Sequence, residues 1–111
     1  MRRIILVRHG KPDIDMTRPV SGAALDDWSS RYDAAPLRAE SMPPHRLREA
    51  LAAASVVVAS DLRRARESAL RAAPDKVPVL DPLYREAPLP VMKRLRLVMQ
   101  ARHWAVVARI A

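Results

Sequence analysis

The sequence predicts an α/β fold with parallel strands, because short aliphatic runs alternate with amphipathic helical segments. The aliphatic runs are "RIILV" at 3–7, "SVVVA" at 55–59 and "KVPVL" at 76–80. Such short, continuous runs are typical of strands that are buried on both faces of a sheet. The helical patterns between them provide the crossovers that parallel strands require. A chain of 111 residues is expected to form one domain, 1–111.

Helical spacing of apolar residues marks two segments in the first half of the chain. The segment 21–33 predicts a short helix, whose apolar side comprises Ala24, Leu25, Trp28 and Tyr32. Prolines at 36, 43 and 44 then indicate a loop, and Pro44 is suited to the first position of a helix. That helix is predicted over 45–54, with an apolar stripe of Leu47, Ala50, Leu51 and Ala54.

The second half of the chain repeats the pattern of strand and helix. After the strand at 55–59, a helix is predicted over 61–73, with Ser60 as its N-cap and Asp61 favourable in its first turn. The strand at 76–80 is expected to be short because it contains Pro78. The chain ends in a helix-like run over 99–111. Strand, helix, strand, helix and strand therefore follow one another.

Composition limits the partners. The formal net charge is +8, from 20 Lys and Arg against 12 Asp and Glu, which favours anionic partners such as phosphate esters, nucleic acid or an acidic protein. No apolar run approaches the roughly 18 residues that span a bilayer, so no membrane partner is expected. Cysteine is absent, as in many proteins of a reducing cytoplasm, where we expect this one. Three scattered histidines form no metal-ligand spacing, so no metal is expected.

Cationic side chains follow two of the predicted strands. Arg8, His9 and Gly10 come directly after the first strand, and Ser60 and an arginine-rich helix follow the second. The carboxyl ends of parallel strands share one edge of a sheet, where ligands bind in open α/β folds. Helix N-termini and arginine forks both bind phosphate. Cations beside the His9 imidazole favour its neutral, nucleophilic form, so the pattern predicts a phosphate site with a nucleophile.

These two segments resemble the signature of the histidine phosphatase superfamily, also called the phosphoglycerate mutase-like family. "LVRHGKP" is similar to its strand followed by Arg-His-Gly, and "ASDLRRARESA" to its strand followed by Ser-x-Leu-x-Arg-Ala-x-x-Thr/Ser-Ala. Asp61 stands where the family usually has proline, and Lys11 where it usually has an acid. The resemblance implies a three-layer α/β/α sandwich.

The resemblance also implies the roles of individual residues. His9 is expected to become phosphohistidine, and Arg8 and Arg64 to clamp the phosphoryl oxygens, with Gly10 and Ser60 in the phosphate-binding set. Only the family register selects Arg64 over Arg63 and Arg66. Glu86, in "LYREAP", is the expected proton donor. No metal or other cofactor is implied, because guanidinium groups supply the charge stabilisation.

The family's second histidine, normally part of a later His-Gly, has no match. Neither His45 nor His103 precedes a glycine. The resemblance therefore suggests an N-terminal portion of such a domain, lacking the C-terminal part. The first strand would then present an open apolar edge, which favours a second copy or a partner that completes the sheet.

Three classes of function are compatible with the sequence. The first is a phosphatase acting on a small phosphorylated substrate or a phosphoprotein, with mutase-type phosphoryl transfer as its close alternative. The second is a phosphate-binding module that lacks turnover because the second histidine is absent. The third, a nucleic-acid binder, is poorly supported because the few aromatic residues are not interleaved with the basic ones.

Overall fold

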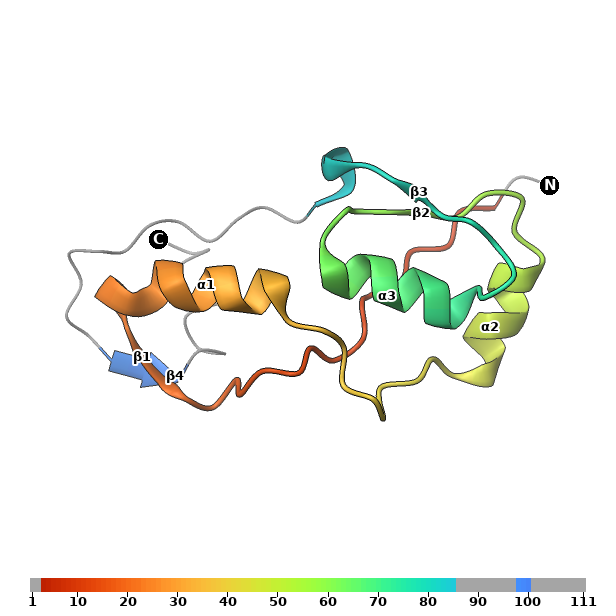
Figure 1. Ribbon diagram of the computed structural model, residues 1–111. Helices are drawn as coiled ribbons and strands as arrows, with labels where there is room; N and C mark the ends of the chain where they lie inside the picture. Colours follow the sequence, from red (N-terminus) through yellow and green to blue (C-terminus); the bar gives the residue numbers. More distant parts are fainter. Residues whose placement is uncertain (1–2, 86–97, 101–111) are drawn as a thin grey trace.

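A computed structural model describes residues 3–85 and 98–100 of the chain. In chain order the elements are β1 (Pro19–Ser21), the 3-10 helix η1 (Gly22–Ala24), α1 (Leu25–Ala34), α2 (His45–Ala52), β2 (Val58–Ala59), α3 (Arg63–Ala72), β3 (Val79–Leu80), the 3-10 helix η2 (Pro82–Tyr84) and β4 (Val98–Gln100) (Figure 1). The protein is thus mixed α/β, as predicted. Among the described residues, no helix has the length and apolar character needed to cross a bilayer.

The parallel pairing predicted for the second and third aliphatic runs is confirmed. Val58 pairs with Val79 and Ala59 with Leu80 in a parallel β2–β3 ladder. Both strands are shorter than the aliphatic runs that contain them, and α3 connects them as the crossover helix. In Figure 1, α3 lies along one side of this pair.

The buried strand predicted over 3–7 is wrong. This segment has no strand structure, and Ile4 and Leu6 are 88% and 93% exposed. Within the described part of the chain, no strand pairs with this segment. Its backbone groups therefore form no ladder, and its side chains find no sheet face to cover. Arg8, His9 and Gly10 accordingly follow an extended segment rather than a strand.

The helix predicted over 21–33 is confirmed as α1, which packs around one of two apolar clusters. Leu25 and Trp28 are buried together with Val20 of β1, as the helical spacing predicts. Ala24 is exposed and belongs to η1 instead. The antiparallel pairing of β1 with β4 was not predicted, and it places residues 99 and 100 of the helix-like run in a strand. Residues 101–111 of that run lie outside the described residues.

The second apolar cluster joins α2 and α3 beneath the parallel pair. Leu51, Ala72 and Ala73 form it, with Leu47 and Val57 packed against it. Both predicted helices are therefore confirmed with slightly different ends. The N-cap predicted for Ser60 is wrong, because α3 begins at Arg63 and Leu62 occupies the cap position without a side-chain hydrogen bond. Ser60 is instead buried just after β2.

Candidate functional site

The Arg-His-Gly segment lies against α3, so the two sequence motifs meet in space. The Gly10 N–H donates a hydrogen bond of 2.8 Å to Oγ of Ser68 on α3. The Ser68 hydroxyl in turn donates to the backbone carbonyl of Arg64, one helical turn earlier, at 2.6 Å. This hydroxyl therefore joins residues 58 positions apart in the sequence, and it brings the neighbour of His9 to the same turn of α3 as Arg64.

His9 is half-buried, and its ring is oriented by its own backbone. Nδ1 lies 2.7 Å from the carbonyl oxygen of Gly10. A carbonyl oxygen can only accept a hydrogen bond, so this contact requires the proton on Nδ1. In the neutral ring, Nε2 then carries the lone pair, and it is the nitrogen that can attack an electrophile.

A loop on the other side of the Arg-His-Gly segment holds the backbone in place. Residues 11–13 and 36–38 run antiparallel, with the Asp13 N–H donating to the Pro36 carbonyl at 2.7 Å and the Arg38 N–H to the Lys11 carbonyl at 2.8 Å. Ser41 Oγ accepts from the Lys11 N–H at 2.8 Å. The segment that contains His9 is therefore fixed between this loop and α3.

The same loop is fastened to α3 by charged side chains. Arg71 donates to the carbonyls of Arg38 and Ser41 at 2.6 and 2.8 Å. Glu67 accepts from the Leu37 N–H at 2.7 Å and from Arg63 at 2.9 Å. These hydrogen bonds, the one from Leu37 above all, hold the pKa of Glu67 below its ordinary value. Arg71 and Glu67 thus serve the architecture of the site.

Glu67→Gln should make stability less dependent on pH on the acid side. Because the pKa of Glu67 is lower in the folded state, its ionised form stabilises the fold above the ordinary value of 4.5, and this contribution is lost as the pH falls through the lowered pKa. The wild-type melting temperature should therefore fall more steeply between about pH 5 and pH 3 than that of the variant. Glu40→Gln, at an exposed loop position, is the control. Parallel melting curves for Glu67→Gln and wild type would contradict the assignment.

Gly10 is required by the close approach of the loop rather than by its backbone angles. A Cβ at position 10 would lie 2.7 Å from Ser41 Oγ and 3.2 Å from Cδ1 of Leu37. Gly10→Ala should therefore destabilise the fold by about 1–3 kcal/mol, measured by urea denaturation. Ser41→Ala removes the nearest atom, so the cost of Gly10→Ala should be smaller in that background. An equal cost in both backgrounds would show that the clash is not with Ser41.

Arg64 is buried and turned toward α1. Its guanidinium forms a 2.8 Å ion pair with Asp33 and lies 4.4 Å from the centre of the Tyr32 ring. The Arg64 side chain is 8% exposed, whereas that of Asp33 is 50% exposed. An anion from solvent could therefore take the place of the accessible Asp33 carboxylate and bind the Arg64 guanidinium, which is already oriented.

The structure describes two of the three remaining predicted site residues, Arg8 and Ser60. Arg8 is exposed, next to His9, and Ser60 is buried at the end of β2. Glu86 lies outside the described residues. Its predecessor Arg85 forms two hydrogen bonds with Asp61 in the loop that leads into α3. The pKa of Asp61 is lowered chiefly by its side-chain hydrogen bond from Arg85. The chain just before Glu86 is thus anchored at the carboxyl end of β2.

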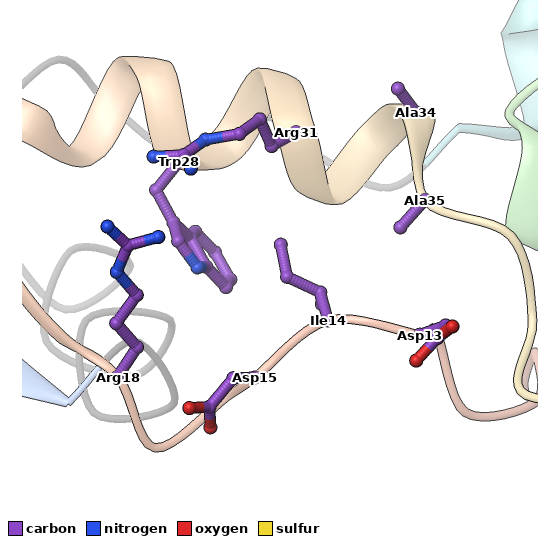
Figure 2. Close-up of a pocket in the computed structure, with 8 residues that line it drawn as sticks. All are labelled: Asp13, Ile14, Asp15, Arg18, Trp28, Arg31, Ala34 and Ala35. Atoms are coloured by element: carbon purple, nitrogen blue, oxygen red, sulfur yellow. The ribbon is translucent and has the colours of Figure 1, made fainter.

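A cavity of about 340 Å³ lies between α1 and the segment that follows Arg-His-Gly-Lys-Pro. Figure 2 shows Ile14 directed toward the Trp28 indole, with the guanidinium of Arg18 beside it. Asp15 lines the cavity as well, and hydrogen bonds from the Thr17 hydroxyl and N–H lower its pKa. The cavity therefore combines an apolar wall with cationic and anionic groups.

Two ion pairs of the site could not be predicted from the sequence. Asp33 was not identified because its pairing with Arg64 spans 31 residues and leaves no local pattern. The Asp61–Arg85 pair was not predicted for the same reason. Ser68 was visible as part of the second motif, but its contact with Gly10 was not. Among the described residues, no group of His, Asp or Glu is arranged to hold a metal ion.

Comparison with known proteins identified no relative of this chain. No protein-family model matches the chain, and no significant match was found among curated proteins or solved structures.

Proposed function

We propose that the chain is a histidine phosphatase-type domain that hydrolyses phosphoric monoesters through a phosphohistidine on His9. The observation that supports this proposal is the hydrogen bond from the Gly10 N–H to Ser68 Oγ. It joins the two segments that carry the family resemblance, and nothing in the sequence alone requires them to touch. The proposal includes the three-layer sandwich, to which the β2–β3 pair and α3 would belong.

The chemistry begins at the histidine ring. With the proton of Nδ1 held by the Gly10 carbonyl, the lone pair of Nε2 attacks phosphorus. A P–N bond forms as the P–O bond to the alcohol breaks, and the alcohol leaves with a proton supplied by Glu86. Water then attacks phosphorus, the P–N bond breaks, and the proton of the water returns to Glu86 as phosphate is released.

Two guanidinium groups would stabilise the charge that develops on the phosphoryl oxygens. Arg8 is adjacent to His9 and exposed. Arg64 is held by Asp33 and Tyr32, and a phosphoryl group would take the place of the Asp33 carboxylate. Bidentate hydrogen bonds from arginine suit phosphate oxygens, and they act without a metal ion. The neighbouring cavity, three residues beyond Gly10, offers space for the non-phosphate part of a ligand.

The experiment combines turnover with capture of the intermediate. The full chain is incubated with p-nitrophenyl phosphate, and ³²P-labelled phosphoenzyme is isolated after rapid quenching in base. We expect release of p-nitrophenol and a label that is stable in base and lost in acid, as a phosphoramidate is. Absence of both turnover and label would overturn the proposal.

A phosphate-binding module without turnover is the second candidate, and one observation favours it. The only other histidine in the described part of the chain is His45 on α2, which is exposed and paired with Glu49 at 2.9 Å. It therefore lies on a different helix from the phosphate-binding groups. Saturable binding of phosphate or vanadate, with no p-nitrophenol released, would select this candidate.

A further inference from the structure

We propose that the cavity beside α1 binds a small carboxylic acid with a flat apolar body, such as an aromatic carboxylate. Two hydrogen-bond donors of the cavity, the indole N–H of Trp28 and the guanidinium of Arg18, would hold the carboxylate, and an apolar wall would hold the body. The inference goes beyond the proposed phosphatase chemistry and does not depend on it. Among the described residues that line this cavity, neither His9 nor Arg64 is present.

The Trp28 indole carries a buried hydrogen-bond donor without a partner. Trp28 is 2% exposed, and within the described part of the chain its Nε1 has no hydrogen-bond acceptor. Buried indole N–H groups usually find an acceptor, because an unpaired one has lost its hydrogen bonds to water. Figure 2 shows this nitrogen on the edge of the ring that faces the chain from Asp15 to Arg18. A ligand with an acceptor group would supply the missing hydrogen bond.

Arg18 brings a positive charge to the same end of the cavity. Its guanidinium lies beside the indole in Figure 2, and it forms no hydrogen bond or ion pair with any residue that the structure describes. The side chain is exposed, so it can rotate and admit a ligand to the covered indole nitrogen. Arg31, the other arginine that lines the cavity, is already paired with Asp27 at 2.7 Å. Of these two arginines, Arg18 is therefore the one available to an anionic ligand.

The two donors favour a carboxylate as the head group of the ligand. An indole N–H and a guanidinium can only donate, whereas an ionised carboxylate only accepts and has an oxygen for each of them. An ammonium group would instead face two donors. The acidic side chains do not occupy these donors. The Asp15 carboxylate accepts from the N–H and hydroxyl of Thr17 at 2.9 and 2.6 Å and is directed away from the indole, while Asp13 lies at the opposite end of the cavity (Figure 2).

The rest of the cavity favours a small apolar body. Ile14, Ala34 and Ala35 line it together with the Trp28 ring. Tyr32 stacks on the indole with 5.2 Å between the ring centres, so the indole is held in place before a ligand arrives. The volume of about 340 Å³ is near the lower end of the roughly 300–1,000 Å³ that ligand pockets span. A single aromatic ring suits this space better than a large cofactor.

Three probes that share one ring and differ in the head group test the proposal: benzoate, benzyl alcohol and benzylamine. Binding to the full chain is followed by the indole N–H resonance of Trp28 in ¹⁵N-labelled protein, assigned with Trp104→Phe. We expect benzoate to shift this resonance downfield and to bind with a Kd on the order of 1 mM, as suits a ligand of its size. Benzyl alcohol should bind at least about threefold more weakly, and benzylamine at least about tenfold. No binding of benzoate up to about 20 mM, or tighter binding of benzylamine than of benzoate, would refute the proposal.

Arg18→Gln separates the proposed site from general attraction of an anion to a basic chain. It should weaken benzoate binding at least about tenfold and that of benzyl alcohol less than about threefold, because only the carboxylate uses the charge. Arg46→Gln removes an exposed arginine from α2 and is the matched control, which should leave both affinities unchanged. His9→Ala should also leave them unchanged, so the result stands whether or not the chain is a phosphatase. Equal losses of benzoate affinity in Arg18→Gln and Arg46→Gln would mean that benzoate responds only to the net charge of +8, contrary to the assignment.

Discussion

His9→Ala is expected to lower kcat/KM for p-nitrophenyl phosphate by at least about 10³-fold, because the substitution removes the imidazole on which the proposed phosphoenzyme forms. The phosphate clamps would remain, so inorganic phosphate should still bind, with an affinity within about tenfold of wild type. The loss should therefore appear mainly in kcat. Steady-state kinetics and phosphate binding by calorimetry separate these two effects.

His45→Ala is the matched control for this substitution. His45 is exposed on α2 and pairs with Glu49, and exposed ion pairs contribute little to stability. Its removal should leave kcat/KM unchanged within a factor of two. If His9→Ala retained wild-type turnover, or if His45→Ala lost as much, the assignment of the nucleophile would fail.

Arg64→Ala is expected to weaken phosphate binding by about 10–100-fold, the effect of losing a charge-assisted hydrogen-bond donor to an anion. Arg71→Ala should weaken it less than threefold, because Arg71 is occupied by the carbonyls of Arg38 and Ser41. Both variants lose a buried or half-buried arginine of α3, which makes them a matched pair. Circular dichroism must show that both are folded, and calorimetry with phosphate then compares them.

Asp33→Asn should have the opposite effect on the same measurement. In the proposed site, phosphate displaces the Asp33 carboxylate from Arg64, so a neutral amide at this position should tighten phosphate binding severalfold. Asp27→Asn, on the same helix but paired with Arg31, should have no effect. Unchanged phosphate affinity in Asp33→Asn, together with a loss in Arg71→Ala equal to that in Arg64→Ala, would place the anion elsewhere on the molecule.

The helices were predictable from sequence because their signals are local. The apolar stripes of α1, α2 and α3 repeat every three or four residues, and each stripe faces an apolar cluster in the structure. Strand 3–7 was not predictable in the same way. An aliphatic run forms a strand only when another strand pairs with it, and that condition depends on distant parts of the chain. Short strands such as β2 and β3 depend on pairing equally, and only their central residues form the ladder.

The candidate site likewise combines local features that the sequence predicts with long-range contacts that it does not predict. His9 and Arg64 were identified as candidates because they belong to two compact motifs. Their tertiary partners were not, since the contacts of Gly10 with Ser68 and of Arg64 with Asp33 cross 58 and 31 residues. Motifs indicate which residues are candidates for binding a ligand, whereas the side chains that hold them in place are chosen by packing and leave no signature in the sequence.

The attachment of residues 11–13 to residues 36–38 has an evolutionary consequence. Two of its hydrogen bonds join main-chain atoms only, so most amino acids could occupy the exposed positions 11 and 13 without loosening the segment next to His9. Those positions are free to change the charge around the imidazole while its location stays constant. Under the proposed function, a lineage could thereby exchange one phosphorylated compound for another through a few surface mutations, at little risk to folding.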